Sequence, residues 1–379
     1  MNPANASDKK RIAMIIPGGI GTGNNNIGVP VLERMIRLLA LEFDVTVFQL
    51  YKRNKGYSVD GFELIDVYSS RPWVRALKLF FVFRRVHRLK KFEVVHGFWI
   101  LPNGFFAVAL GKIFGLKSIV SILGGDAIAL PEINYGQLIK PLYRRISFWT
   151  LRKADEVTAL TRYLVHNLRS IGMKPREIHI IPWGIDTNLF AFREKEVQQP
   201  IRFLHIANLH PVKDQETLLR AFKIIAESVE SHLTLIGEGV LESRLKTLAG
   251  ELAIENCITF LGLLPYEALP EYYTDADILL HTSRSEGQSE VVTEAMSSGV
   301  VVCGTKVGLI YDLEEFCVAV PIGDHRALAR ETLALIKDSN RINALRKDAF
   351  VWANIHSIHW TVGQTGGCYR KTIRFSGKR

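Results

Sequence analysis

The stretch that most constrains the fold runs from residue 278 to residue 303. Two short apolar runs, 278–280 and 300–303, enclose a polar loop and a segment whose apolar residues recur at helical spacing. Short apolar runs that end in polar or glycine residues are typical of buried parallel strands. Ser289 stands where a helix would be capped, and Gly299 where it would end. The stretch therefore predicts a strand-loop-helix-strand unit of an open parallel sheet, whose ligands bind at the carboxyl ends of the strands.

Two glutamates lie at that end of the predicted sheet. Glu286 is in the loop before the helix and Glu294 lies a little over one turn inside it, so the amides of residues 288–291 lie between two carboxylates. Free amides at a helix N-terminus attract an anion, whereas carboxylates accept hydrogen bonds from neutral hydroxyls. A ligand with phosphates in the middle and polyols at both ends satisfies all three groups. A nucleotide-sugar has that layout.

This segment resembles the Glu-x7-Glu signature of the retaining glycosyltransferases of family 4. The wider match is Ser-x-x-Glu-Gly-x-x-x-Val-x-x-Glu-Ala-Met-x-x-Gly-x-x-Val, with Gln288 and Ser289 where many members carry an aromatic residue and a glycine. The resemblance covers nearly the whole chain and is strongest from residue 201 to 329. It implies an α/β chain of the GT-B fold, in which two Rossmann-like, doubly wound parallel-sheet domains face a central cleft.

The expected domain organisation follows from the resemblance and from the composition of the linker. Residues 1–190 form an N-terminal acceptor-binding domain, residues 191–355 form a C-terminal domain for the nucleotide-sugar, and a helix over about 355–379 returns to the first domain. The charged segment 190–200, which ends in Gln198-Gln199-Pro200, is the expected linker. A chain of 379 residues is long enough for two domains of ordinary size.

In the second domain, the resemblance implies contacts with the donor. Lys213 precedes a predicted helix, where an ammonium group and helix amides can share a diphosphate. Asn208 stands where the family usually has an arginine, so phosphate neutralisation rests on Lys213 and amides, or on another cation such as Arg284. By resemblance, Glu286 binds hydroxyls of the donor sugar and Glu294 those of the ribose. The predicted catalytic residues of this domain are Glu286 and Lys213, and the predicted donor contacts are Glu294, Gly287, Gln288, Ser289, Glu290, Asn208 and Leu263.

Two polar residues of the first domain follow buried strands and are predicted to be catalytic. His96 and Asp126 lie at the sheet edge where ligands bind. Asp126 matches the last position of the family's His-Gly-x-Asp segment, whereas Phe98 and Leu123 stand where a histidine is common. His96 fits a catalytic group or a hydrogen-bonded histidine of the core, and both interpretations stay open.

The glycine loop after the first strand does not match a dinucleotide site, because Asn24 stands where the third glycine belongs. Gly19 is a predicted donor contact by resemblance, or part of a flexible turn. By resemblance, no metal and no cofactor beyond the nucleotide-sugar are expected. Asp275-Ala-Asp277 has the letters of an Asp-x-Asp metal-binding motif but begins a predicted buried strand. The four cysteines show no paired spacing, which fits a reducing compartment.

Positive charge is concentrated in the first half of the chain. Residues 1–190 carry 27 basic and 14 acidic side chains, whereas residues 191–379 carry 21 and 24. Residues 71–91 hold eight basic residues, no acidic residue and five aromatic rings, counting His87. This composition suits an anionic membrane surface; the alternative is that the apolar residues pack on the sheet while the charges stay in water. The predicted surface contacts are Arg75, Lys78, Arg84, Arg85 and Arg88.

Together these features predict a retaining, metal-independent hexosyltransferase that uses an NDP-sugar and a glycan or lipid-linked acceptor, in cell-surface polysaccharide or lipopolysaccharide synthesis. The chain starts with polar residues, and no apolar run approaches the roughly 20 residues that span a bilayer. A cytoplasmic protein is expected, with peripheral attachment to the inner face of the plasma membrane left open. Nucleic acid is not an expected partner. Two alternatives remain: a nucleotide-sugar epimerase of the same fold, and a non-catalytic membrane-associated subunit of a polysaccharide assembly complex.

Overall fold

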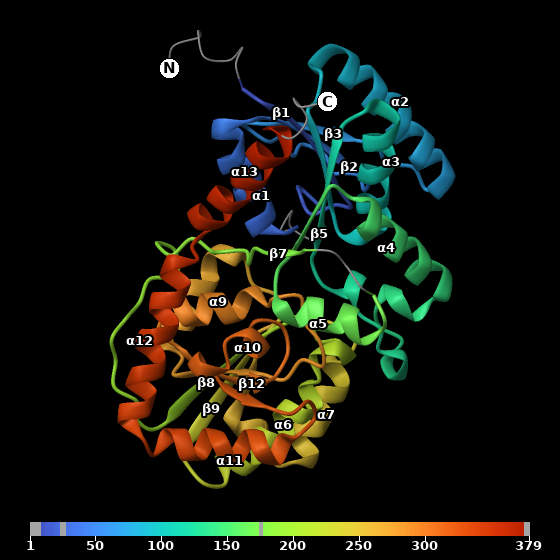
Figure 1. Ribbon diagram of the computed structural model, residues 1–379. Helices are drawn as coiled ribbons and strands as arrows, with labels where there is room; N and C mark the ends of the chain where they lie inside the picture. The colour runs from blue at the N-terminus through green and yellow to red at the C-terminus, as the bar shows by residue number, and fades with distance from the viewer. Residues whose placement is uncertain (1–8, 23–27, 174–176, 375–379) are drawn as a thin grey trace. The chain divides into compact units, whose positions relative to one another are not determined.

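A computed structural model of the chain describes residues 9–22, 28–173 and 177–374. The chain divides into two compact units (Figure 1). Unit 1 contains the residues up to Leu160, residues 164–182 and the residues from Ile358 on; unit 2 contains residues 161–163 and 183–357. Each unit has one parallel sheet with helices packed on it. The predicted pair of Rossmann-like parallel-sheet domains is confirmed.

The sheet of unit 1 has the strand order β3-β2-β1-β4-β5-β6-β7. All its pairings are parallel, and Met14 lies opposite His96 in the centre. Its central strands are buried along nearly their whole length, because they are apolar runs between two layers of helices. The strands are β1 (Arg11–Ile16), β2 (Asp44–Gln49), β3 (Glu63–Asp66), β4 (Val94–Phe98), β5 (Lys117–Ile122), β6 (Glu156–Ala159) and β7 (His179–Ile180).

The last helix of the chain belongs to unit 1, where it packs beside the first helix (Figure 1). Its Tyr369 is fully buried and meets the ring of Phe43 edge-on, with 5.4 Å between the ring centroids. The helices that start in or at the border of unit 1 are α1 (Pro30–Glu42), α2 (Pro72–Lys90), α3 (Phe105–Phe114), α4 (Pro141–Lys153), α5 (Arg162–Ser170) and α13 (Ile358–Arg374).

The sheet of unit 2 has the strand order β10-β9-β8-β11-β12-β13, again with parallel pairings. Its strands are β8 (Ile201–Ile206), β9 (Ser231–Ile236), β10 (Ile258–Phe260), β11 (Ile278–His281), β12 (Val301–Thr305) and β13 (Val318–Val320). Its helices are α6 (Gln215–Ala226), α7 (Glu242–Glu251), α8 (Leu269–Asp275), α9 (Glu290–Ser297), α10 (Gly308–Asp312), α11 (His325–Ile336) and α12 (Ser339–Ile355). Two apolar clusters cover the two faces of the sheet and form the core of the unit.

The segment 278–303 forms the predicted strand-loop-helix-strand unit, made of β11, α9 and β12. Gly299 closes the helix at φ +75°, a conformation that glycine adopts without strain. Ser289 takes the predicted N-cap position, but its side chain makes no capping hydrogen bond and its φ is +78°. The basic helix α4 begins at Pro141, because the fixed φ of proline favours the first helical position.

Candidate active site

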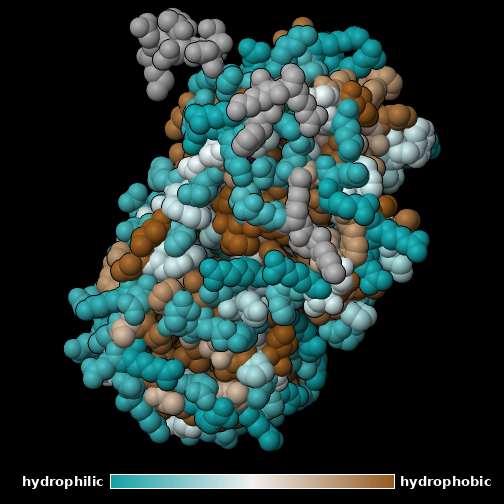
Figure 2. All heavy atoms as spheres, viewed as in Figure 1, coloured by the Kyte–Doolittle hydropathy of each residue, from teal (hydrophilic) through white to brown (hydrophobic). Residues whose placement is uncertain are grey.

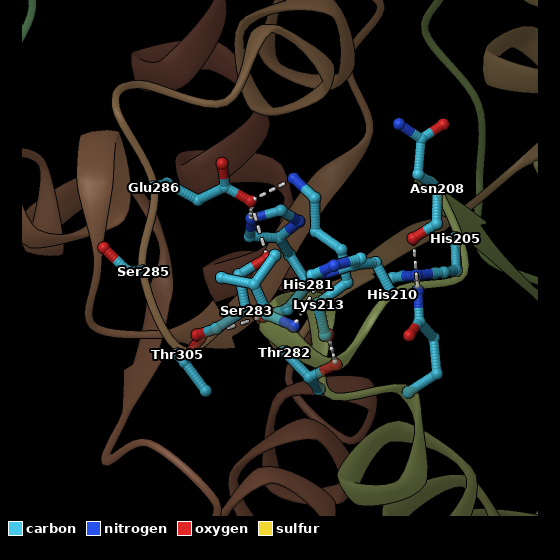
Figure 3. A network of polar contacts seen from close by, with 12 residues as sticks. His205, Asn208, His210, Lys213, His281, Thr282, Ser283, Ser285, Glu286 and Thr305 are labelled. Atoms are coloured by element: carbon cyan, nitrogen blue, oxygen red, sulfur yellow. Dashed lines mark hydrogen bonds and ion pairs between the residues drawn. The ribbon is translucent and has the colours of Figure 1, made fainter. Parts of the chain in front are cut away.

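The carboxyl edge of the sheet in unit 2 gathers three polar residues (Figure 3). Lys213 ends the short turn η7 (Pro211–Lys213) after β8, His281 is the last residue of β11, and Glu286 lies in the loop between β11 and α9. Because β8 and β11 are paired and parallel, the segments that follow them leave the sheet at the same edge. Residues far apart in the sequence therefore meet at this edge.

One oxygen of Glu286 accepts two hydrogen bonds and lies close to a histidine. Lys213 Nζ and Ser283 Oγ each donate to Oε1 at 2.6 Å, and His281 Nε2 lies 3.3 Å from the same atom. In Figure 3 the second carboxylate oxygen points away from these groups. Burial favours the neutral acid, but Lys213 and His281 outweigh it and hold the pKa of Glu286 well below its ordinary range. Glu286 is therefore an anion at neutral pH.

Backbone contacts hold the lysine turn and the glutamate loop together. The hydroxyl of Thr282 lies 3.0 Å from the carbonyl oxygens of both Lys213 and Asp214. The amide of Arg284 donates to the carbonyl of Val212 at 2.8 Å, and its guanidinium lies 3.3 Å from the Asp214 carboxylate. The positions of Lys213 and Glu286 are thus set by the backbone and not only by their mutual attraction.

Two glycines allow the neighbouring chain to approach this cluster closely. A Cβ on Gly304 of β12 would lie 2.2 Å from the carbonyl oxygen of His281, and a Cβ on Gly308 would lie 2.7 Å from the Cβ of Glu286. Both distances are below any real contact, so larger residues would push the strand end and the loop apart. Thr305 adds a hydrogen bond of 2.5 Å to the carbonyl of Ser283.

Glu294 is buried in α9 with a tyrosine partner. Its side chain is 2% exposed and accepts a hydrogen bond of 2.7 Å from Tyr273 of α8. Burial raises the pKa of Glu294 to about 7, although the hydrogen bonds from Tyr273 and Tyr266 oppose it. Burial and the charge of Glu294 raise the pKa of Glu290, one turn earlier, to about 8. Hydroxyl groups of a ligand would stabilise the ionised form of either carboxyl.

The residues between Glu286 and α9 shape the backbone at the start of the helix. Both ends of the Gln288 amide bind the backbone of Trp183, which donates its N–H at 2.7 Å and accepts at 2.6 Å. Gln288 is 3% exposed, so it holds the segment around Trp183, and its predicted donor contact stays a prediction. Ser289 adopts the positive φ that glycine favours, which explains why glycine suits this position. Gly287 and Ser289 bring backbone amides to the edge where Glu286 lies.

Two further predicted donor contacts lie after strands of the same sheet. Asn208 follows β8 and is exposed, and its backbone carbonyl accepts a hydrogen bond of 3.0 Å from Gln215. Leu263 follows β10 and is 39% exposed. Both residues therefore lie at the carboxyl edge of unit 2, and their roles remain predictions.

In unit 1, His96 is a buried residue of β4 with a partner on each ring nitrogen. Its Nδ1 lies 2.8 Å from the Tyr369 hydroxyl of α13, and its Nε2 lies 2.7 Å from Ser121 Oγ. Its ring stacks on Phe98 with 4.1 Å between the centroids. Burial lowers the pKa of His96 to about 3, so the ring is neutral. These contacts give His96 a structural role, and the predicted catalytic role is untested.

Asp126 links the loops that follow β4 and β5. Its carboxylate accepts backbone hydrogen bonds from Ile100 at 2.8 Å, Gly124 at 2.7 Å and Leu123 at 3.3 Å. Burial outweighs these bonds and raises the pKa of Asp126 to about 6. The side chain is 1% exposed, so its observed function is to shape the loops.

A cavity of about 530 Å³ lies beside Asp126 within unit 1. Lys140 lies with its Nζ 5.2 Å from the ring centroid of Tyr143, and Gln137 has a buried Oε1 without a hydrogen-bond partner among the described residues. Trp99 is held at φ +68°, a conformation that is rare for a bulky residue. The cavity is lined by Trp99, Gly125, Asp126, Asn134, Tyr135, Gly136, Gln137, Ile139, Lys140 and Tyr143.

Gly19 lies in the loop after β1 of unit 1. It has φ +107°, and its carbonyl accepts a hydrogen bond of 2.8 Å from the amide of Val29 at the start of α1. A Cβ at Gly19 would lie 3.1 Å from the Val29 side chain, so the loop packs closely on the helix. Its predicted contact with the donor stays untested.

The five predicted surface contacts of α2 divide into two groups. Arg75 and Lys78 donate hydrogen bonds to the carbonyls of Ser69 and Tyr68, and the Arg75 guanidinium lies 5.2 Å from the ring centroid of Tyr51. The remaining three point into solvent beside exposed apolar side chains, so Figure 2 shows hydrophilic and hydrophobic surface interleaved over this helix. These exposed residues are Arg84, Arg85 and Arg88, with Trp73, Leu77 and Phe81.

In the described part of the chain, no helix combines the length and the apolar character that crossing a membrane requires. Within the same residues, no group of three His, Cys, Asp or Glu side chains is arranged to hold a metal ion. Cys303 and Cys317 are buried, and all four cysteines are free thiols.

Sequence reasoning missed three residues of the site. His281 directly follows the apolar run 278–280, which is the signal that pointed to His96 in the other unit. Ser283 belongs to the motif string but had no role assigned. Tyr273 comes from a separate helix 21 residues before Glu294, and no local pattern connects the two.

Two Rossmann-like parallel-sheet units, one with a charged pair at its carboxyl edge, fit the class of GT-B glycosyltransferases. Residues 28–184 match the model of a glycosyl transferase 4-like domain, and residues 186–352 match that of the glycosyl transferases group 1. The two matches together extend over both units. The chain therefore belongs to the family-4 type of glycosyltransferase. The Glu-x7-Glu signature and the retaining mechanism that the resemblance implied stay predictions.

Individual relatives agree with this family. The chain is 25% identical over 67% of its length to the N-acetyl-alpha-D-glucosaminyl L-malate synthase of Bacillus anthracis, of which 68% is covered. It is 30% identical over 46% of its length to the amylovoran biosynthesis glycosyltransferase AmsK of Erwinia amylovora, of which 46% is covered. The structure of Anabaena HepE in complex with UDP-glucose superposes with a TM-score of 0.75 at 17% identity, covering 95% of this chain and 99% of that one.

Proposed function

We propose that the protein is a retaining glycosyltransferase that moves a sugar from a nucleoside diphosphate to a glycan or lipid-linked acceptor. The observation that carries the proposal is the ion pair of Lys213 with Glu286 at the carboxyl edge of unit 2, with Glu294 in the following helix. A cation for a diphosphate and two carboxylates for hydroxyls then belong to one sheet edge. This arrangement suits a nucleotide-sugar better than a free sugar or a free nucleotide.

Each side chain has a role that follows from its charge. As the bond between the anomeric carbon and the diphosphate oxygen breaks, negative charge grows on the phosphates, and Lys213 stabilises it. The outward oxygen of Glu286 accepts hydrogen bonds from the donor sugar, and Glu294 accepts those of the ribose hydroxyls. The backbone amides of residues 288–291 add positive potential at the start of α9. These groups supply positive charge without a metal ion.

The names of the relatives support a donor and a pathway of this kind. HepE is described in complex with UDP-glucose, and AmsK is named for the synthesis of the polysaccharide amylovoran. We therefore assign this protein to cell-surface polysaccharide or lipopolysaccharide synthesis at the inner face of the membrane.

The cavity of unit 1 suits a carbohydrate acceptor. Its aromatic side chains offer faces for sugar rings, and Asn134 and Gln137 offer amide groups for hydroxyls. Lys140 adds a positive charge, so an acceptor that carries a phosphate or carboxylate fits best. A volume of about 530 Å³ is within the usual range of small-molecule sites.

The proposed function is tested by replacing the two charged groups of the site. In Glu286→Gln and Lys213→Ala, transfer from the NDP-sugar should fall about 100-fold to 1,000-fold, which is typical of removing one charge-stabilising group. The surface variants Glu271→Gln and Lys246→Ala are matched controls and should keep wild-type rates. Product is measured by transfer of labelled sugar, and its anomeric configuration by NMR.

A loss of less than threefold in both site variants contradicts the site assignment. Inversion at the anomeric carbon contradicts the retaining mechanism. Turnover of the nucleotide-sugar without any acceptor supports the epimerase instead, and nucleotide binding without turnover, even with authentic acceptors, supports the non-catalytic subunit.

A further inference from the structure

A diphosphate that binds at this site would compete with Glu286 for the ammonium group of Lys213. Lys213 Nζ lies 2.6 Å from Glu286 Oε1, so the ammonium that should hold the phosphates already neutralises a carboxylate. The Glu286 side chain is 11% exposed, and a buried carboxylate that loses its cation is costly. Some other donor must therefore stabilise Glu286 once the diphosphate attracts Lys213.

His281 is placed to be that donor. It is 1% exposed at the end of β11, and its Nε2 lies 3.3 Å from Glu286 Oε1, the oxygen to which Lys213 donates. Among the described residues, neither ring nitrogen of His281 makes a well-aligned hydrogen bond. A buried ring without its hydrogen bonds has free energy to gain from a closer contact with Glu286.

The neighbours of His281 on β8 and β12 add no charge and leave room for its backbone. His205 on the neighbouring strand β8 is fully buried, donates from Nδ1 to the carbonyl of Leu280 at 2.8 Å, and has its pKa lowered to about 3 by burial. It is therefore a neutral neighbour. Gly304 lets β12 pass against the His281 backbone. A small movement of the Glu286 carboxylate suffices to exchange one donor for the other.

We propose that His281 is a positioning residue that holds Glu286 Oε1 when the donor diphosphate draws Lys213 away. This inference rests on the proposed function, because it requires Lys213 to bind the diphosphate. In the tautomer that carries hydrogen on Nε2, His281 donates together with Ser283, so Glu286 keeps two donors while its outward oxygen serves the sugar. His281 itself touches no substrate.

Two conservative variants separate this role from simple packing. In His281→Gln the amide nitrogen falls near the position of Nε2 and keeps a donor for Glu286, whereas in His281→Asn the shorter amide falls near Nδ1 and does not reach it. Both replace the ring by a smaller polar group. Titration calorimetry with UDP, GDP, ADP and TDP should find affinity close to wild type in His281→Gln and about tenfold or more weaker in His281→Asn.

A second pair of variants shows whether the effect passes through Glu286. The substitution Glu286→Gln removes the negative charge, so in that background the loss on adding His281→Asn should shrink to less than about threefold, which is the coupling that a double-mutant cycle measures. His232→Asn is the matched control, because His232 lies in the same unit and bonds to Thr259 away from the site. It should bind the nucleotide as wild type does.

The outcomes are distinct. If His281→Asn binds the nucleotide as tightly as wild type, or weakens binding equally in the Glu286→Gln background, the proposed role of His281 is wrong while the donor site stands. If wild type binds none of the four nucleotides, the proposed function fails and this inference fails with it. Melting temperatures of the ligand-free variants report whether each one is folded.

Discussion

Two buried histidines in parallel strands show how the same residue type serves different purposes. His96, predicted at a strand end, lies in the middle of β4 in unit 1, whereas His281 is the last residue of β11 in unit 2. Both side chains are at most 2% exposed. His96 has Tyr369 and Ser121 as close partners, whereas Nε2 of His281 lies 3.3 Å from the charged carboxylate of Glu286. A histidine with two hydrogen-bond partners, such as His96, stabilises the fold. A histidine such as His281, which lies close to a carboxylate without a well-aligned hydrogen bond, can form that bond when the site binds its ligand.

At the residue scale, His96 predicts a pH dependence of stability. Its pKa is about 3 in the folded chain against an ordinary value of 6.5, so the unfolded chain takes up a proton first as the pH falls. The stability that comes from the neutral ring is present above pH 6.5 and is lost as the pH falls towards 3. At about pH 5 the loss is roughly 2 kcal/mol. The free energy of unfolding is measured with urea at about pH 7.5 and at about pH 5. The decrease between the two pH values should be smaller by roughly 2 kcal/mol in His96→Gln than in wild type. Parallel pH profiles of wild type and variant would contradict it.

The roles of single residues were the hardest to predict from the sequence. Glu286 and Lys213 were found because a motif and a helix start marked them, and the structure pairs them at 2.6 Å. The partners of His96 and Glu294 were not found, because Tyr369 and Tyr273 come from distant helices. Whether a buried polar group has a partner is a tertiary property, and periodicity carries no information on it.

At the scale of elements, α2 combines apolar and basic side chains on one exposed face. Successive helical residues turn by about 100°, so Trp73, Leu77, Phe81 and the exposed arginines fall within an arc of about 120°. Trp73, Leu77 and Phe81 are 62%, 50% and 60% exposed, and the helix has no acidic residue. The face opposite, with Leu79 and Phe83, packs on the sheet. The packing interpretation therefore holds for the inward face, and we propose that the outward face binds an anionic membrane.

The membrane proposal predicts two separable losses in liposome flotation. Arg84→Ala, Arg85→Ala and Arg88→Ala together should weaken binding to anionic vesicles by about 1 kcal/mol each at low salt, and salt should weaken wild-type binding in the same way. Replacing Trp73, Leu77 and Phe81 by serine should also weaken binding, with the charge unchanged. Leu41→Ser, on another exposed position of unit 1, is the control. If neither set of substitutions weakens binding to the vesicles, the membrane proposal is wrong, and the exposed face of α2 simply contacts solvent.

Elements were predicted well where an apolar pattern or a proline marks them. The strands β11 and β12 and the helix α9 lie where the pattern of residues 278–303 placed them. The details of their ends differ, as at Ser289, because the cap depends on a backbone angle that a neighbouring loop imposes. The cavity of unit 1 was not predicted, since the irregular segment 124–140 that lines much of it has no periodicity.

At the scale of the whole molecule, two sheets and a returning helix define the fold. The two parallel sheets follow from apolar strands that alternate with helices along the chain. The basic charge falls in the first half and the charged pair of the site in the second, so acceptor and donor are assigned to different units. The sequence could not predict the identity of the base, the sugar or the acceptor, because contacts through backbone amides and aromatic faces leave no residue pattern that identifies a particular ligand.

The central claim is that unit 2 binds a nucleoside diphosphate through Lys213. The most direct measurement is the melting temperature of the full chain with UDP, GDP, ADP or TDP at millimolar concentration, without metal. A ligand at about 100 times its Kd adds about 2.7 kcal/mol, which should raise the melting temperature by a few degrees. We expect one nucleotide to do so in wild type and in Lys246→Ala, and to fail in Lys213→Ala. The absence of a shift with every nucleotide, or an equal shift in Lys213→Ala, would contradict the account.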